Sequence, residues 1–190
     1  MSAAPEWLKQ WNARRFADQY AGKSWERLLP DSGIYEKLAG KDAIEGEWDR
    51  KDISFPHRIR QAPPLKGFYE DFRRTPFADE MVLHAALEAM KAHGLGEDAV
   101  TDILAIGFSA TDVVGHTYGS DSHEAMDQLL RLDQTLQKLF EEIDRRVGLA
   151  ETWVVLSADH ASMPLVEIAR NRGLPAKSFR SDAVEAVVKQ

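Results

Sequence analysis

The chain has 190 residues, of which 44% are hydrophobic and 29% are charged, and it contains no cysteine. This length and composition suit one globular domain with a real core, and nothing in the composition suggests disorder. A formal net charge of -7 disfavours broad electrostatic attraction to nucleic acid or to anionic lipid. Without cysteine, disulfides and thiolate ligands are excluded, so any metal ion must be held by histidine and carboxylate side chains.

No membrane segment is expected in this sequence. No run approaches the ~18 consecutive apolar residues of a membrane span, and the first residues lack the apolar core of a signal peptide. We therefore expect neither nucleic acid nor a membrane as a partner. The sequence carries no feature that specifies an oligomeric state.

Residues 1–75 are predicted to be a largely irregular covering segment. Residues 6–20 are rich in helix formers, with large apolar residues spaced as in a short amphipathic helix. From residue 22 to residue 76, prolines and glycines interrupt every periodic run. Many aromatic residues in this stretch favour an ordered layer over a free linker, and loops of such length usually bind or cover something.

Residues 76–190 are predicted to form an α/β core in which helices alternate with strands. The expected helices span residues 76–93, 122–147, 164–172 and 181–189, and the expected strands span residues 103–108 and 152–156. This order of elements predicts a parallel, or mixed, sheet with flanking helices, whose ligands gather at the carboxyl ends of the strands. We treat residues 1–190 as a single domain.

An Asp/His pair follows each of the two predicted strands. Asp112 and His116 are four residues apart, so they share one face if the chain becomes helical after Thr111. Asp159 and His160 directly follow the second strand. One such residue alone is more often a helix cap or a turn former than a metal ligand. The same placement at two strand ends favours a single divided metal site.

The remaining histidines and hydroxyl groups have simpler interpretations. We assign His84, His93 and His123 to helices and leave His57 without a role. Ser109 and Thr111 are expected to be turn residues or hydrogen-bond partners of the ligands rather than nucleophiles. Asp127 and Asp133 are expected to be helix charges or hydrogen-bond partners rather than ligands.

Three motifs, in order, resemble those of the type I phosphodiesterase and alkaline phosphatase superfamily. The runs are SATDVVGHTYG, EAMDQLLRLDQTLQKLFEEID and VVLSADHA, and the superfamily carries a TDxxGHxxG loop, an RLD helix and a terminal ADHG. The resemblance extends roughly from residue 7 to residue 175. Three motifs in the same order, with fitting separations, form a far more specific signal than any one of them.

The resemblance implies a two-metal phosphohydrolase. It places Asp112 and His116 on one divalent ion and Asp159 and His160 on a second, both most simply zinc. Zinc ions about 4 Å apart clamp a transferring phosphoryl group in such sites. The implied reaction is hydrolysis of a phosphate monoester or diester, a small molecule, through a phosphorylated Thr or Ser. Relatives are typically exported, which is an analogy for localisation only.

The sequence also departs from the superfamily pattern. Counterparts of the first strand, with its metal-binding Asp, and of the nucleophile are not found, no histidine follows His160, and Ala161 replaces the last glycine of ADHG. We therefore expect a partial catalytic domain, the C-terminal portion of an alkaline-phosphatase-like fold that lacks the first strand–helix units. Such a chain would expose a sheet edge and apolar surface.

Two functions follow from this expectation. The first is the C-terminal portion of a metal-dependent phosphohydrolase, inactive by itself because it carries no catalytic nucleophile and offers only two protein ligands per metal ion. The alternative is a catalytically silent binding or assembly domain, or a remnant, that retains the fold.

Overall fold

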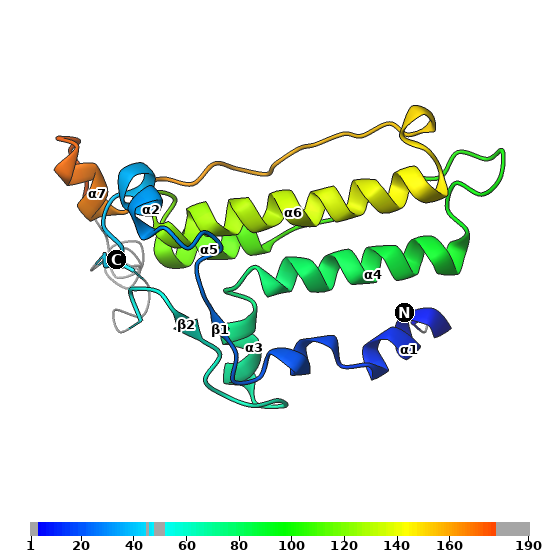
Figure 1. Ribbon diagram of the computed structural model, residues 1–190, viewed down its shortest axis with the longest axis horizontal. Helices are drawn as coiled ribbons and strands as arrows, with labels where there is room; N and C mark the ends of the chain where they lie inside the picture. Colours follow the sequence, from blue (N-terminus) through cyan, green and yellow to red (C-terminus); the bar gives the residue numbers. More distant parts are fainter. Residues whose placement is uncertain (1–3, 45, 48–51, 178–190) are drawn as a thin grey trace, which may run out of the picture.

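Two long helices form the frame of the protein (Figure 1). The computed structural model describes residues 4–44, 46–47 and 52–177. Helix α4 (Phe77–His93) packs against helix α6 (His123–Arg146), and the two run in the same direction. Gly94 ends α4 in the left-handed conformation, and the Ser122 hydroxyl caps α6 by accepting from the Ala125 N–H. Both predicted helices are confirmed.

A short helix, α5 (Ala110–Tyr118), precedes α6 and packs against it. It begins at Ala110, so the condition under which Asp112 and His116 share one face, a helical chain after Thr111, is met. On its inner side Val114 is fully buried and Tyr118 nearly so. Residues four apart share a helix face, so the chain buries one face of α5 and leaves another for polar side chains.

The two predicted strands run as extended chain without strand partners among the described residues. Residues 101–108 and 152–158 contain no paired strand, and Figure 1 shows both segments running in the same direction, opposite to α4 and α6. The only sheet of the described chain is the antiparallel pair β1 (Ser24–Trp25) and β2 (His57–Arg58). The structure therefore shows a helix-rich fold, and the parallel sheet stays a prediction.

Apolar side chains on these extended segments are exposed. Ile103 is 89% exposed, and the second segment exposes Trp153 at 96% and Val155 at 88%. β-Branched and aromatic residues in a short run are typical of a strand that is covered on both faces. The uncovered apolar surface matches the expectation for a chain of this kind, whereas the exposed sheet edge stays a prediction.

The covering segment is more regular than predicted. Helices α2 (Ser32–Ala39) and α3 (Lys66–Phe72) form inside the stretch predicted to be irregular. The helix predicted over residues 6–20 is divided into α1 (Glu6–Ala13) and the 3-10 helix η1 (Phe16–Tyr20), because Arg15 adopts a positive φ of 50°. The prediction missed these helices because each is short and depends on packing, as Tyr35 of α2 does by being buried.

The remaining elements lie near the end of the described chain. A 3-10 helix, η2 (Leu149–Glu151), follows α6, and α7 (Val166–Asn171) confirms the short helix predicted over residues 164–172. The helix predicted over residues 181–189 lies outside the described residues. None of the described helices has both the length and the apolar character needed to cross a bilayer.

Aromatic side chains of the covering segment form the core. They pack on the inner face of α5, as the predicted aromatic layer requires. The buried cluster consists of Ala17, Tyr20, Trp25, Ile59, Phe68, Phe72, Phe77, Val114 and Tyr118. Burial of such large side chains stabilises the fold by about 25 cal/mol per Å² of apolar surface. The covering segment therefore holds α5 in place through its inner face, which carries Val114 and Tyr118.

The first turns of α6 bury polar side chains that hold other elements. Glu124 contacts His57 of β2, with 2.7 Å between Oε1 and Nε2, and His123 contacts the Gly40 carbonyl at 2.8 Å through Nε2. Gln128 donates to Asp79 of α4 at 2.8 Å. Each of these side chains on α6 is at most 1% exposed. The N-terminal half of α6 therefore ties the covering segment and α4 together.

Asp79 is expected to make stability depend on pH. Burial raises the pKa of its carboxyl from 3.8 to about 6, against the smaller opposing effect of the hydrogen bonds from the Ala110 N–H and Gln128. The folded state then binds more protons than the unfolded chain between pH 4 and 6. The contribution of Asp79 to the free energy of unfolding is therefore full below about pH 4 and is lost as pH rises through about 6. The free energy of unfolding falls by about 3 kcal/mol over this range.

Urea unfolding of the wild type and of Asp79→Asn between pH 4 and pH 7 checks this dependence. The difference in unfolding free energy between the two proteins should shift in favour of Asp79→Asn as pH rises, because asparagine does not titrate. A difference that stays constant across this range would contradict the raised pKa of Asp79.

Candidate metal centre

Helix α5 presents its second face to a loop that follows the second extended segment. Asp112 lies in the first turn of α5 and His116 one turn later, on the side away from the aromatic core. Both side chains are largely exposed, at 44% and 65%. The predicted i, i+4 placement of this carboxylate and imidazole is therefore present in the structure.

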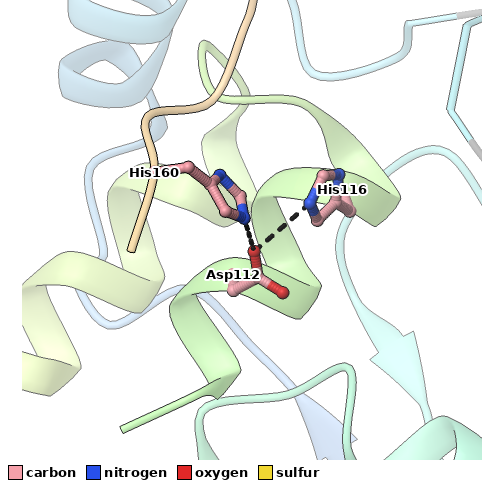
Figure 2. A group of neighbouring side chains, drawn as sticks. All are labelled: Asp112, His116 and His160. Atoms are coloured by element: carbon pink, nitrogen blue, oxygen red, sulfur yellow. Dashed lines mark ion pairs between the residues drawn. The ribbon is translucent and has the colours of Figure 1, made fainter. Parts of the chain in front are cut away.

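His160 joins this pair from a distant part of the sequence. Figure 2 shows its ring pointing toward Asp112 from the extended chain, beside the ring of His116. Asp112 Oδ1 lies 3.1 Å from His160 Nε2 and 3.2 Å from His116 Nε2. One ligand atom from each of the three residues lies within 4.8 Å of the other two, which is a group able to hold one metal ion.

Asp159 is not a member of this group of three. Its Oδ1 instead accepts a hydrogen bond from the backbone N–H of His160 at 3.1 Å. The prediction from the sequence assigned one pair of residues to each ion, whereas in the structure His160 lies with Asp112 and His116. The role of Asp159 as a ligand, and the division between two ions, stay predictions.

The three side chains fit a divalent cation by chemistry as well as by distance. Asp112 Oδ1 is shielded from solvent yet has no hydrogen-bond partner, although two imidazole nitrogens lie next to it. Two imidazoles and one carboxylate are a donor set that zinc accepts, with a fourth position left for water or substrate. A cation between these atoms would bind an oxygen that otherwise has only the two imidazole nitrogens beside it.

The pKa of His160 is raised from its usual value. The first cause is the hydrogen bond from its ring to the Ala161 carbonyl, followed by the negative charge of Asp159 and then that of Asp112. Without a cation, a proton on this exposed ring is thus favoured by the carboxylates around it. A metal ion competes with that proton for the same Nε2 atom, so metal binding should weaken as pH falls.

The glycines of the TDxxGHxxG motif make room for the loop that carries His160. A Cβ on Gly115 would lie 3.1 Å from Ser162 Oγ, and one on Gly119 would lie 2.8 Å from Leu165. Gly119 also has a positive φ of 95°, which side chains disfavour. These two close approaches seat residues 162–165 directly against α5 and so bring His160 over Asp112.

Ala161 fits where the superfamily has glycine. Among the described residues Arg15 alone combines a side chain with a positive φ, so the backbone at Ala161 does not need glycine. The substitution that distinguished this chain from the ADHG motif therefore costs no backbone strain.

The other residues weighed from the sequence have mainly structural contacts. His84 packs on Phe16 and His93 on Trp7, as expected of helix residues. His57, left without a role, is buried in β2 against Glu124. Thr111 receives a weak hydrogen bond from Gln128 at 3.4 Å.

Sequence reasoning missed the importance of Asp127. Its position predicts a helix charge or a hydrogen-bond partner of the ligands, whereas it is fully buried and accepts hydrogen bonds from Trp25, Tyr35 and the Leu28 N–H. The available signal was its place four residues before Arg131, which pairs with it at 2.6 Å.

Comparison with known proteins identifies the family. The family model described as type I phosphodiesterase / nucleotide pyrophosphatase matches residues 5–179. The chain belongs to this family. The resemblance to this family that the three motifs indicate is thereby confirmed over nearly the whole sequence.

Several of the relatives that this chain matches are named alkaline phosphatases. The chain is 31% identical over 183 residues to alkaline phosphatase PafA of Elizabethkingia meningoseptica. This match covers 94% of this chain and 33% of the relative. It is 32% identical over 173 residues to alkaline phosphatase PhoV of Synechococcus elongatus, covering 90% and 31%. This family member thus spans about a third of the length of the curated relatives it matches.

The fold matches a solved structure of the same kind. The crystal structure of wild-type PafA superimposes with a TM-score of 0.81 at 30% identity, and the match covers 100% of this chain and 37% of PafA. The alkaline-phosphatase-like fold predicted from the motifs is therefore shown, although this chain covers only 37% of the PafA chain.

Proposed function

We propose that this chain is the metal-binding portion of a phosphatase that hydrolyses phosphate esters. The observation that carries the proposal is the group formed by Asp112, His116 and His160, in which a carboxylate oxygen that is shielded from solvent faces two imidazole nitrogens. Phosphate mono- or diesters are the substrate class, because the family and its alkaline phosphatase relatives are named for that chemistry.

Asp112, His116 and His160 would hold one divalent cation, and Asp159 would contribute to a second, both being zinc. Bound cations at this position would supply positive charge for the phosphoryl oxygens and lower the pKa of a nucleophile. The side chains of this chain do the positioning: α5 fixes Asp112 and His116, and the loop seated on Gly115 and Gly119 fixes His160. No residue of this chain is assigned as the nucleophile.

The extended segments are proposed to be strands of a parallel sheet that further strands complete. Support comes from their common direction, their exposed apolar side chains and the alkaline-phosphatase-like match, which covers 37% of PafA. Unpaired strands with apolar side chains recruit further strands readily. Such strands would cover Trp153 and Val155 and place a nucleophile beside the metal group.

Hydrolysis of p-nitrophenyl phosphate with added Zn²⁺ tests this proposal. The chain alone should show negligible turnover, and turnover should appear when it is mixed with the part of PafA that it does not match. Asp112→Asn should abolish the activity of the mixture. Robust turnover by the chain alone that Asp159→Ala removes would instead mean that this chain supplies its own nucleophile.

A second candidate function is an assembly domain without catalysis. The exposed apolar side chains of residues 152–156 favour it, since patches of this kind usually mark a protein interface. The two functions differ in metal dependence. An assembly domain would bind its partner equally well with Zn²⁺ and with a chelator, and its Asp112→Asn variant would bind normally.

A further inference from the structure

The N-terminus of α5 is capped from another helix rather than by its own sequence. Ser109 occupies the N-cap position, but its side chain makes no capping hydrogen bond. The N–H of Ala110, the first of the helix, instead donates to Asp79 Oδ1 of α4 at 3.1 Å. Both residues are 2% exposed, so water does not replace this bond. A carboxylate 31 residues away therefore performs the capping.

Asp79 is itself held in one orientation. Its second oxygen, Oδ2, accepts from Gln128 Nε2 of α6 at 2.8 Å, and the same amide nitrogen lies 3.4 Å from Thr111 Oγ1 in the first turn of α5. Gln128 is fully buried. One carboxylate thus joins α4, α5 and α6 at the start of the helix that carries two of the candidate ligands.

This arrangement affects Asp112, which is the third residue of α5. Acidic side chains in the first helical turn are attracted to the free N–H groups there, as in the capping box. Asp112 instead faces His116 and His160, with 3.2 and 3.1 Å from its Oδ1 to their Nε2 atoms. Asp79 fixes the backbone from which this side chain projects, because it holds the Ala110 N–H two residues earlier.

We propose that Asp79 is a positioning residue for the metal group, acting through the first turn of α5 so that Asp112 stays directed at the two histidines. This inference rests on the proposed metal-binding function. Asp79 is buried and does not contact the metal group, yet it fixes the direction of the ligand Asp112.

Three variants separate this role from general stability. Asp79→Ala removes the cap. Asp79→Asn retains an oxygen for the Ala110 N–H, and its amide can donate to Gln128 if that side chain turns over, because Gln128 Oε1 has no partner in the wild type. Leu139→Ala is the control: Leu139 is buried on α6, about 16 Å along the helix from Gln128, and its truncation costs about 2–5 kcal/mol.

Affinity for Zn²⁺ alone, measured by competition with a chelator at pH 7, is the first readout. Asp79→Ala should bind about 10–100-fold more weakly, the usual cost of removing a group that orients a ligand. Asp79→Asn should stay within about threefold of the wild type, and Leu139→Ala should be unchanged although less stable. Wild-type affinity in Asp79→Ala, or an equal loss in Leu139→Ala, overturns the proposal.

Amide hydrogen exchange without metal is the second readout. The first turn of α5 should exchange faster in Asp79→Ala than in Asp79→Asn, because only alanine leaves the Ala110 N–H without an acceptor. Equal protection in the two variants overturns the proposal. A wild type that binds no Zn²⁺ would count against the metal site itself, and the exchange experiment would still decide whether Asp79 fixes this turn.

Discussion

Asp112→Asn is expected to weaken Zn²⁺ binding by more than about a hundredfold. In the wild type, both His116 Nε2 and His160 Nε2 lie next to the Oδ1 atom of Asp112, and this oxygen has no other partner. The substitution preserves size but removes the negative charge that offsets the cation. Losing a direct ligand should exceed the ~10–100-fold cost of losing a group that only orients one.

Isothermal titration with Zn²⁺ measures this effect, and Asp133→Asn is the matched control. The Asp133→Asn substitution removes the same negative charge, but on the exposed side of α6. This variant should therefore bind Zn²⁺ as the wild type does. His116→Ala and His160→Ala should each resemble Asp112→Asn. Unchanged affinity in Asp112→Asn would show that Zn²⁺ binds elsewhere on the chain.

The long helices were predictable because their signals are local. Helix α4 has periodic apolar residues between Pro76 and Gly94, and α6 has a capping serine and a long apolar stripe. Helices α2 and α3 were not predicted, since each has at most 8 residues and short helices are stable only through packing. That packing involves aromatic residues distant in sequence.

The predicted strands show a different limit. An apolar run gives the same pattern whether or not a neighbouring strand is present to pair with it. The sequence therefore indicates what residues 152–156 are suited to form, while the fold shows Trp153 and Val155 exposed in extended chain. The resemblance to the superfamily predicts an exposed sheet edge and uncovered apolar surface, and the fold shows the apolar surface.

The candidate ligands were predictable to different degrees. Asp112 and His116 follow from helical spacing, and His160 from its place after the second strand. The regrouping of His160 with the first pair depends on how the loop is seated against Gly115 and Gly119, which the spacing does not specify.

The buried carboxylates Asp79, Glu124 and Asp127 could not be recognised from the sequence. Each lies in a helix whose other acidic residues include less buried ones, and charged side chains in helices are usually exposed. Their burial is explained by partners far along the chain, at separations of 31 residues for Asp79, 67 for Glu124 and 102 for the contact of Asp127 with Trp25. Nothing local signals these long-range contacts, although the i, i+4 spacing of Asp127 and Arg131 indicates one local partner.

Asp127→Ala is expected to destabilise the fold by about 3–5 kcal/mol, the usual cost of removing one partner of a buried ion pair. Asp127 is fully buried and pairs with Arg131 at 2.6 Å. It also accepts from Trp25 Nε1 and the Leu28 N–H, each at 2.6 Å, and from the Tyr35 hydroxyl. Alanine leaves all of these donors without their acceptor, two of them on fully buried side chains.

Urea unfolding followed by tryptophan fluorescence measures this loss, with Asp133→Ala and Tyr35→Phe for comparison. Asp133→Ala should change stability by less than about 0.5 kcal/mol because it alters the exposed face of the same helix. Tyr35→Phe removes one donor and should cost about 0.5–1.5 kcal/mol. If Asp127→Ala costs no more than Tyr35→Phe, the covering segment is held by its aromatic packing alone. A large cost instead means that the covering segment, which packs behind α5, needs this carboxylate to stay on α6.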